Sequence, residues 1–126
     1  MCTLARRSFY DIRKRPYDLC KKFYSQLSQQ GKRNAWLNGL RNVYGDKEFT
    51  SLLDKIVTPT LILWGKHDVT VPEYIAEEFH TRIRNSVVAT FPQSAHSVPL
   101  EQPRELCTTM SAFIHQTDTT NILIKE

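Results

Sequence analysis

Asp68 and His96 are the two residues of this chain whose types and spacing suggest chemistry. Asp68 follows an apolar run that ends at Gly65, and His96 comes 28 residues later, after a second short apolar run. If both runs are strands of one sheet, the two side chains lie at the same edge, where a carboxylate can orient an imidazole for proton transfer. Taken alone, Asp68 is also compatible with a simple turn at the start of a helix.

The chain offers no nucleophile to complete this pair. None of its eight serines falls in a G-x-S-x-G sequence, the sharp strand–turn–helix elbow that exposes a serine nucleophile. The four glycines, at positions 31, 39, 45 and 65, build neither that elbow nor a glycine-rich oxyanion loop. We therefore expect no hydrolase turnover from the chain alone.

Apolar patterns predict the elements that position the two residues. Residues 59–65 and 86–91 are typical of parallel strands, the first buried on both faces, and residues 72–84 between them predict a helix that opens at a proline. A last helix is expected at residues 103–116. Because two strands do not form a stable sheet, we expect the missing strands in another chain or in a deleted N-terminal region.

Residues 1–45 have a different character. They predict loosely amphipathic helices, the first of which we expect to end at Gly31, and residues 46–55 predict a further short helix. Residues 1–45 carry ten Lys/Arg against two acids, a balance of +8, and residues 46–126 carry seven against eleven, a balance of −4. Such a split indicates either a basic arm for an acidic partner or solvated helix faces, and we favour the second.

These residues together resemble the C-terminal portion of an α/β-hydrolase-fold protein. The pattern covers about residues 54–115 and consists of Pro59 to Gly65, Asp68, Val71-Pro72, Ala95-His96 and Glu101-x-Pro103. The resemblance implies an α/β fold with two parallel strands flanked by helices and preceded by a helical lid. Residues 1–45 would form the lid or cap, and residues 46–126 the C-terminal part of the hydrolase core. Ala95 is a departure, because the family usually has glycine there.

The resemblance also implies a reaction, the hydrolysis of an ester, amide or related bond by a nucleophile–His–Asp triad. Asp68 would orient His96, and His96 would activate a nucleophile that this chain lacks. A small-molecule substrate is implied, and neither a metal nor an organic cofactor. We expect an exposed sheet edge beside residues 61–63, which favours self-association or a partner chain that completes the fold.

Other functions stay open at this point. The chain is also compatible with a non-catalytic, truncated or partner-binding module that uses the basic N-terminal helices, and with a decayed hydrolase that has no present role. Nucleic acid is not the partner we expect, because no nucleic-acid-binding motif is present.

The cysteines and the apolar runs bear on location. Cys2, Cys20 and Cys107 are odd in number and have no C-x-x-C spacing, which favours free thiols in a reducing compartment. No apolar run approaches the roughly 20 residues of a membrane span. We therefore expect a cytoplasmic protein without a membrane partner.

Overall fold

The computed structural model describes residues 7–43 and 51–123, without the side chains of residues 19, 40–43 and 117–123. Its elements, in chain order, are the 3-10 helix η1 (Ile12–Lys14), α2 (Tyr17–Leu27), α3 (Gln30–Val43), β1 (Thr60–Gly65), α5 (Tyr74–Arg82), β2 (Ser86–Phe91), α6 (Val98–Glu101) and α7 (Pro103–Leu123). Of the short helix expected at residues 46–55, residues 46–50 lie outside the described ranges and residues 51–53 are helical. The predicted lid boundary at residue 45 also lies outside them.

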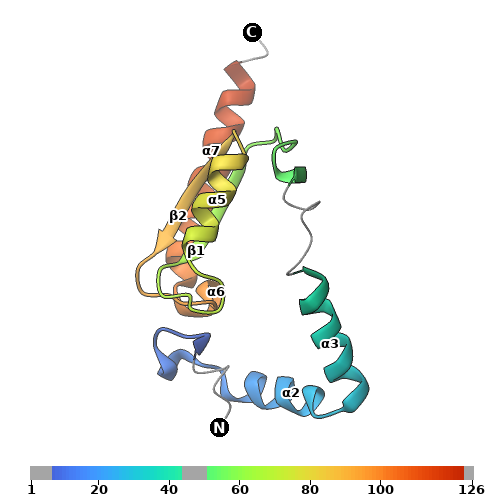
Figure 1. The fold of residues 1–126 in the computed structure, drawn as a ribbon. Coiled ribbons are helices and arrows are strands. Elements are labelled where there is room, and N and C mark those ends of the chain that lie inside the picture. Colours follow the sequence, from blue (N-terminus) through green and yellow to red (C-terminus); the bar gives the residue numbers. More distant parts are fainter. Residues whose placement is uncertain (1–6, 44–50, 124–126) are drawn as a thin grey trace.

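The two strands form a parallel sheet. They pair in register from Thr60 opposite Ser86 to Gly65 opposite Phe91, so their carboxyl ends meet at one edge. Helix α5 connects the strands and contacts both of them, with Ala76 fully buried, while α7 passes behind the strands in Figure 1. The predicted fold class, two parallel strands flanked by helices, is confirmed.

Helix boundaries differ from the sequence expectation in two places. Helix α5 is shorter than residues 72–84, because Ile83 takes an extended conformation and closes the helix after Arg82. Helix α7 continues to Leu123 rather than ending at residue 116. No proline or glycine after Pro103 interrupts it, so nothing local stops the helix there. Neither α7 nor any other helix in the described ranges is long and apolar enough to cross a membrane.

The N-terminal helices extend away from the sheet (Figure 1). The expectation that Gly31 ends the first helix was wrong: α2 ends at Leu27, where Ser28 donates both its N–H and its hydroxyl to the Tyr24 carbonyl, and α3 already begins at Gln30. Aromatic side chains on α2 are also more exposed than a helix core requires, with Tyr17 at 66% and Phe23 at 43%. The role of these helices as a lid stays a prediction.

Candidate active site

The site lies where the two strands end. Beyond the last strand pair, the loop after β1 stays tied to the loop after β2: the N–H of Lys66 donates to the Phe91 carbonyl and the N–H of His67 to the Ser94 carbonyl, both at 3.0 Å. Each loop therefore continues the direction of its strand for a short distance. This brings residues 66–68 and 94–96 face to face.

Asp68 divides its two carboxylate oxygens between two tasks. Oδ2 lies 2.8 Å from Nδ1 of His96. Oδ1 accepts the backbone N–H groups of Thr70 at 2.8 Å and Val71 at 3.0 Å, which is the turn geometry of a loop aspartate. The side chain is only 7% exposed, so water competes little for either set of contacts. Both sequence interpretations of this residue, turn former and histidine partner, describe its geometry.

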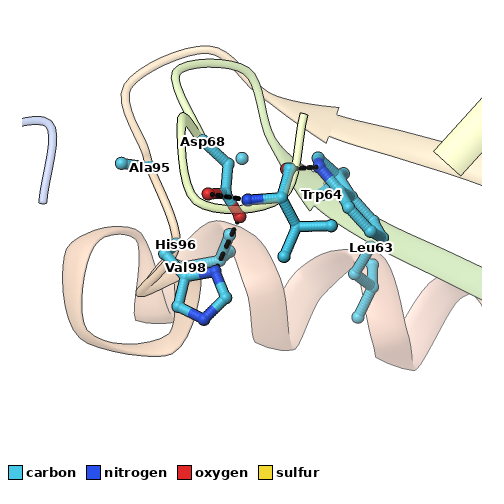
Figure 2. Close-up of a pocket in the computed structure, with 8 residues that line it drawn as sticks. Leu63, Trp64, Asp68, Ala95, His96 and Val98 are labelled. Carbon is cyan, nitrogen blue, oxygen red and sulfur yellow. Dashed lines mark hydrogen bonds and ion pairs between the residues drawn. The ribbon is translucent and has the colours of Figure 1, made fainter. Parts of the chain in front are cut away.

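The ring edge of His96 that carries Nε2 lies opposite the edge that contacts Asp68 and is directed toward the open side of the site. Figure 2 shows its imidazole extending past Asp68, with the second ring nitrogen pointing away from the other side chains drawn. The side chain is 47% exposed. When Nδ1 carries the proton and donates it to Asp68, Nε2 is left as an accessible acceptor, the arrangement that a general base requires.

A small cavity of about 160 Å³ borders this pair. It is lined by Leu63, Trp64, Gly65, Asp68, Val71, Ala95, His96 and Val98, and its walls are mainly apolar. Trp64 shapes one wall by donating its indole N–H to the Val71 carbonyl at 3.1 Å. Ligand sites usually measure roughly 300–1,000 Å³, so this cavity is smaller than a usual ligand site. Trp36, on α3, does not line it.

Two further residues position the site and were not assigned a role from sequence. The buried side chains of Glu101 and Gln102, at the end of α6, accept hydrogen bonds from residues 93–95 of the histidine loop. The sequence signal was the Glu101-x-Pro103 pattern, which belongs to the family resemblance and precedes the helix expected at residues 103–116. Within the described ranges no cluster of three or more His, Cys, Asp or Glu forms a metal site.

Several curated hydrolases are similar to part of this chain. The uncharacterized hydrolase YugF of Bacillus subtilis is 35% identical over 75 residues, which are 60% of this chain and 27% of YugF. The monoacylglycerol lipase ABHD6 of Mus musculus is 38% identical over 69 residues, which are 52% of this chain and 20% of that lipase. No family model matches the chain.

The fold has a counterpart among solved structures. The crystal structure of a serine hydrolase involved in carbazole degradation, the CarC enzyme, superposes with a TM-score of 0.61 and 24% identity, over 74% of this chain and 37% of that one. The chain has an α/β-hydrolase fold. It spans about a fifth to a quarter of the length of these curated relatives.

The arrangement of Asp68 and His96 is suited to proton transfer. The pair can accept a proton at Nε2 and stabilise the resulting imidazolium through the buried carboxylate. Breaking a substrate bond additionally needs a nucleophile near Nε2 and donors for the developing oxyanion. Hydrolysis by such a pair therefore requires these further groups in addition to Asp68 and His96.

Proposed function

We propose that this chain supplies the acid and base of a hydrolase triad, Asp68 and His96, and that another segment supplies the nucleophile. The observation that carries the proposal is the 2.8 Å contact between Nδ1 of His96 and Oδ2 of the buried Asp68. The named activities of the relatives support the reaction class, since YugF is a hydrolase and ABHD6 a monoacylglycerol lipase. The substrate class we propose is a small ester, amide or related compound.

In this proposal Nε2 of His96 carries the proton from the nucleophile to the leaving group. A nucleophile hydroxyl attacks the carbonyl carbon of the substrate, and its proton passes to Nε2 of His96 while Asp68 stabilises the imidazolium. Collapse of the tetrahedral intermediate breaks the bond to the leaving group, which takes the proton from Nε2. Water then attacks the acyl group with the same assistance, releasing the acid and restoring the hydroxyl.

The unpaired edge of β1 is where we propose that the completing segment adds. In the described part of the chain, β1 pairs with β2 along one edge, and its other edge has no strand partner. A two-stranded sheet is marginal in water, whereas a strand added beside β1 would extend the sheet. Such a strand comes from a longer form of this protein, a partner chain or a second copy.

A chimera tests the proposal. Residues 60–116 of this chain would replace the structurally equivalent segment of YugF, and hydrolysis of short-chain p-nitrophenyl esters would be measured. We expect His96→Ala in the chimera to lower kcat by several orders of magnitude, as loss of a triad base does. A folded chimera that hydrolyses esters equally fast with and without His96 would refute the proposal.

The chain by itself gives a complementary assay. Purified protein incubated with the same activated esters should match the buffer rate, because none of its serines lies in a G-x-S-x-G elbow. Activity of the chain alone that disappears in His96→Ala would show that a nucleophile is present after all. The partner-binding alternative stays a prediction, and salt-dependent binding of the basic helices to an acidic partner would favour it.

A further inference from the structure

Glu101 is a buried carboxylate whose two oxygens hold different parts of the chain. Its side chain lies at the end of α6 and the residue is only 2% exposed. Oε2 accepts the backbone N–H of Ala95 at 2.8 Å, and Oε1 accepts the backbone N–H of Asp11 at 2.9 Å. Hydrogen bonds from N–H groups to a carboxylate are stronger than those between neutral groups. One side chain thus joins the residue before His96 to the N-terminal segment.

The histidine loop is held from the same end of α6 by the next residue. The side-chain oxygen of Gln102 accepts the N–H of Gln93 at 3.0 Å and the hydroxyl of the fully buried Ser94 at 3.2 Å. With Glu101, this fixes the backbone of residues 93–95. The Cα position of His96, and with it the approach of its ring to Asp68, depends on this support.

The N-terminal segment makes a second contact with Glu101 and also reaches the loop of Asp68. Lys14 donates its ammonium group to the Glu101 carbonyl at 2.6 Å. The ring of Tyr10 stacks on that of His67, the residue before Asp68, with centroids 4.5 Å apart. The segment of residues 10–14 therefore contacts the loop of Asp68 directly and is joined to the loop of His96 through Glu101. It lies beside α6 and leads directly into α2 (Figure 1).

We propose that Glu101 is a positioning residue for His96, and that it couples the geometry of the Asp68–His96 pair to the placement of the segment that leads into helices α2 and α3. The functional meaning of this coupling rests on the proposed triad, but the coupling itself is a property of the chain alone. When the segment is docked, the carboxylate is shared between Asp11 and Ala95. When the segment leaves, Oε1 loses its donor and the carboxylate is free to move from the histidine loop.

The experiment uses the full chain and NMR. Glu101→Gln keeps the size of the side chain but replaces one acceptor oxygen with a donor, so it can serve only one of the two N–H groups. We expect roughly tenfold faster hydrogen exchange at the amide of Ala95 or Asp11, as loss of one such bond implies. We also expect a shifted or broadened signal for the ring Nδ1–H of His96. Glu105→Gln, at an exposed position in the first turn of α7, is the matched control and should change neither.

A second variant approaches the coupling from the N-terminal side. Lys14→Met removes the contact to the Glu101 carbonyl, and Lys22→Met removes the same charge from an exposed position on α2. The coupling predicts that Lys14→Met, and not Lys22→Met, shifts the His96 ring signal. If the His96 ring signal is unchanged in both Lys14→Met and Glu101→Gln, the proposed coupling is wrong, even if the amides of residues 10–14 exchange faster. Asp68→Asn separates this inference from the proposed function: if that variant leaves the His96 signal unchanged, the Asp68–His96 pair itself is absent.

Discussion

Gly65 lies directly against the backbone of Ala95. A Cβ at position 65 would touch the Ala95 carbonyl oxygen and would lie 2.8 Å from both the Ala95 carbonyl carbon and the Ser94 oxygen. The backbone of Gly65 does not need a positive φ, so the glycine is required for space and not for conformation. This close approach is what lets the loop of Asp68 and the loop of His96 meet.

Gly65→Ala should therefore push the two loops apart. Because the atoms in the way are backbone, the methyl group cannot be accommodated by a rotamer change, and we expect a loss of about 1–3 kcal/mol in the free energy of unfolding. Urea denaturation followed by circular dichroism measures it. Gly39→Ala is the control: no atom lies near its added Cβ in α3, so it should be neutral or stabilise by up to about 1 kcal/mol. Equal effects of the two substitutions would contradict the packing argument.

The two tasks of the Asp68 carboxylate can be separated by two substitutions. Asparagine keeps an oxygen for the N–H groups of Thr70 and Val71 but presents its amide N–H₂ to His96, which forces the ring proton from Nδ1 to Nε2. Asp68→Asn should thus retain the fold, reverse the tautomer seen in the ¹⁵N shifts of the ring, and lower kcat in the chimera about 10⁴-fold.

Asp68→Ala loses the loop contacts as well. We expect it to be less stable than Asp68→Asn by about 1–2 kcal/mol, because two backbone N–H groups lose their acceptor. Urea unfolding of the two variants side by side gives the difference. If both variants unfold at the same urea concentration, Oδ1 does not hold the loop.

The strands and the position of the site could be predicted from sequence because they depend on local patterns. The apolar runs ending at Gly65 and Phe91 identify β1 and β2, and a parallel pair necessarily brings the following loops to one edge. Asp68 and His96 follow from that topology. The 2.8 Å distance between Nδ1 of His96 and Oδ2 of Asp68 depends on backbone contacts between the two loops, and no pattern of residue types predicts those contacts.

The supporting contacts were missed because they join segments that are distant in sequence. Glu101 and Asp11 are separated by 90 positions, and no local sequence pattern predicts a contact between them. Ala95 stands where the family usually has glycine, a residue that can adopt a positive φ without strain. No described residue has a positive φ, so the methyl group of Ala95 causes no strain there. The glycine that the site needs is the one at position 65.

Trp64 stabilises the aspartate loop through its indole N–H. That group donates to the Val71 carbonyl at 3.1 Å, while the ring meets Phe79 edge-on with centroids 6.4 Å apart. Trp64→Phe keeps most of the apolar contact and removes the hydrogen bond, so we expect a loss of about 1 kcal/mol and faster amide exchange in residues 68–71. Trp36→Phe on α3 is the control and should leave that exchange unchanged. Unaltered exchange in Trp64→Phe would exclude this role.

Asp11, whose N–H binds Glu101, carries a carboxylate that is itself held by Arg13. Hydrogen bonds from the Arg13 side chain, at 2.8–3.2 Å, and from its backbone N–H, at 3.0 Å, lower the pKa of Asp11 from 3.8 to about 2. A lowered pKa favours the ionised form in the folded state. The resulting stabilisation of the η1 turn is therefore complete above pH 3.8 and is lost as the pH falls through about 2.

Substitution of Arg13 tests whether its side chain lowers the pKa of Asp11. In Arg13→Gln the pKa of Asp11 should rise from about 2 toward 3.8, because the guanidinium that favours the carboxylate is gone. NMR titration of the Asp11 carboxyl carbon measures the shift directly. Arg15→Gln removes an equal charge from a side chain that does not bind Asp11, and should leave the titration near pH 2. A midpoint that stays near 2 in Arg13→Gln would assign the lowered pKa to a different group.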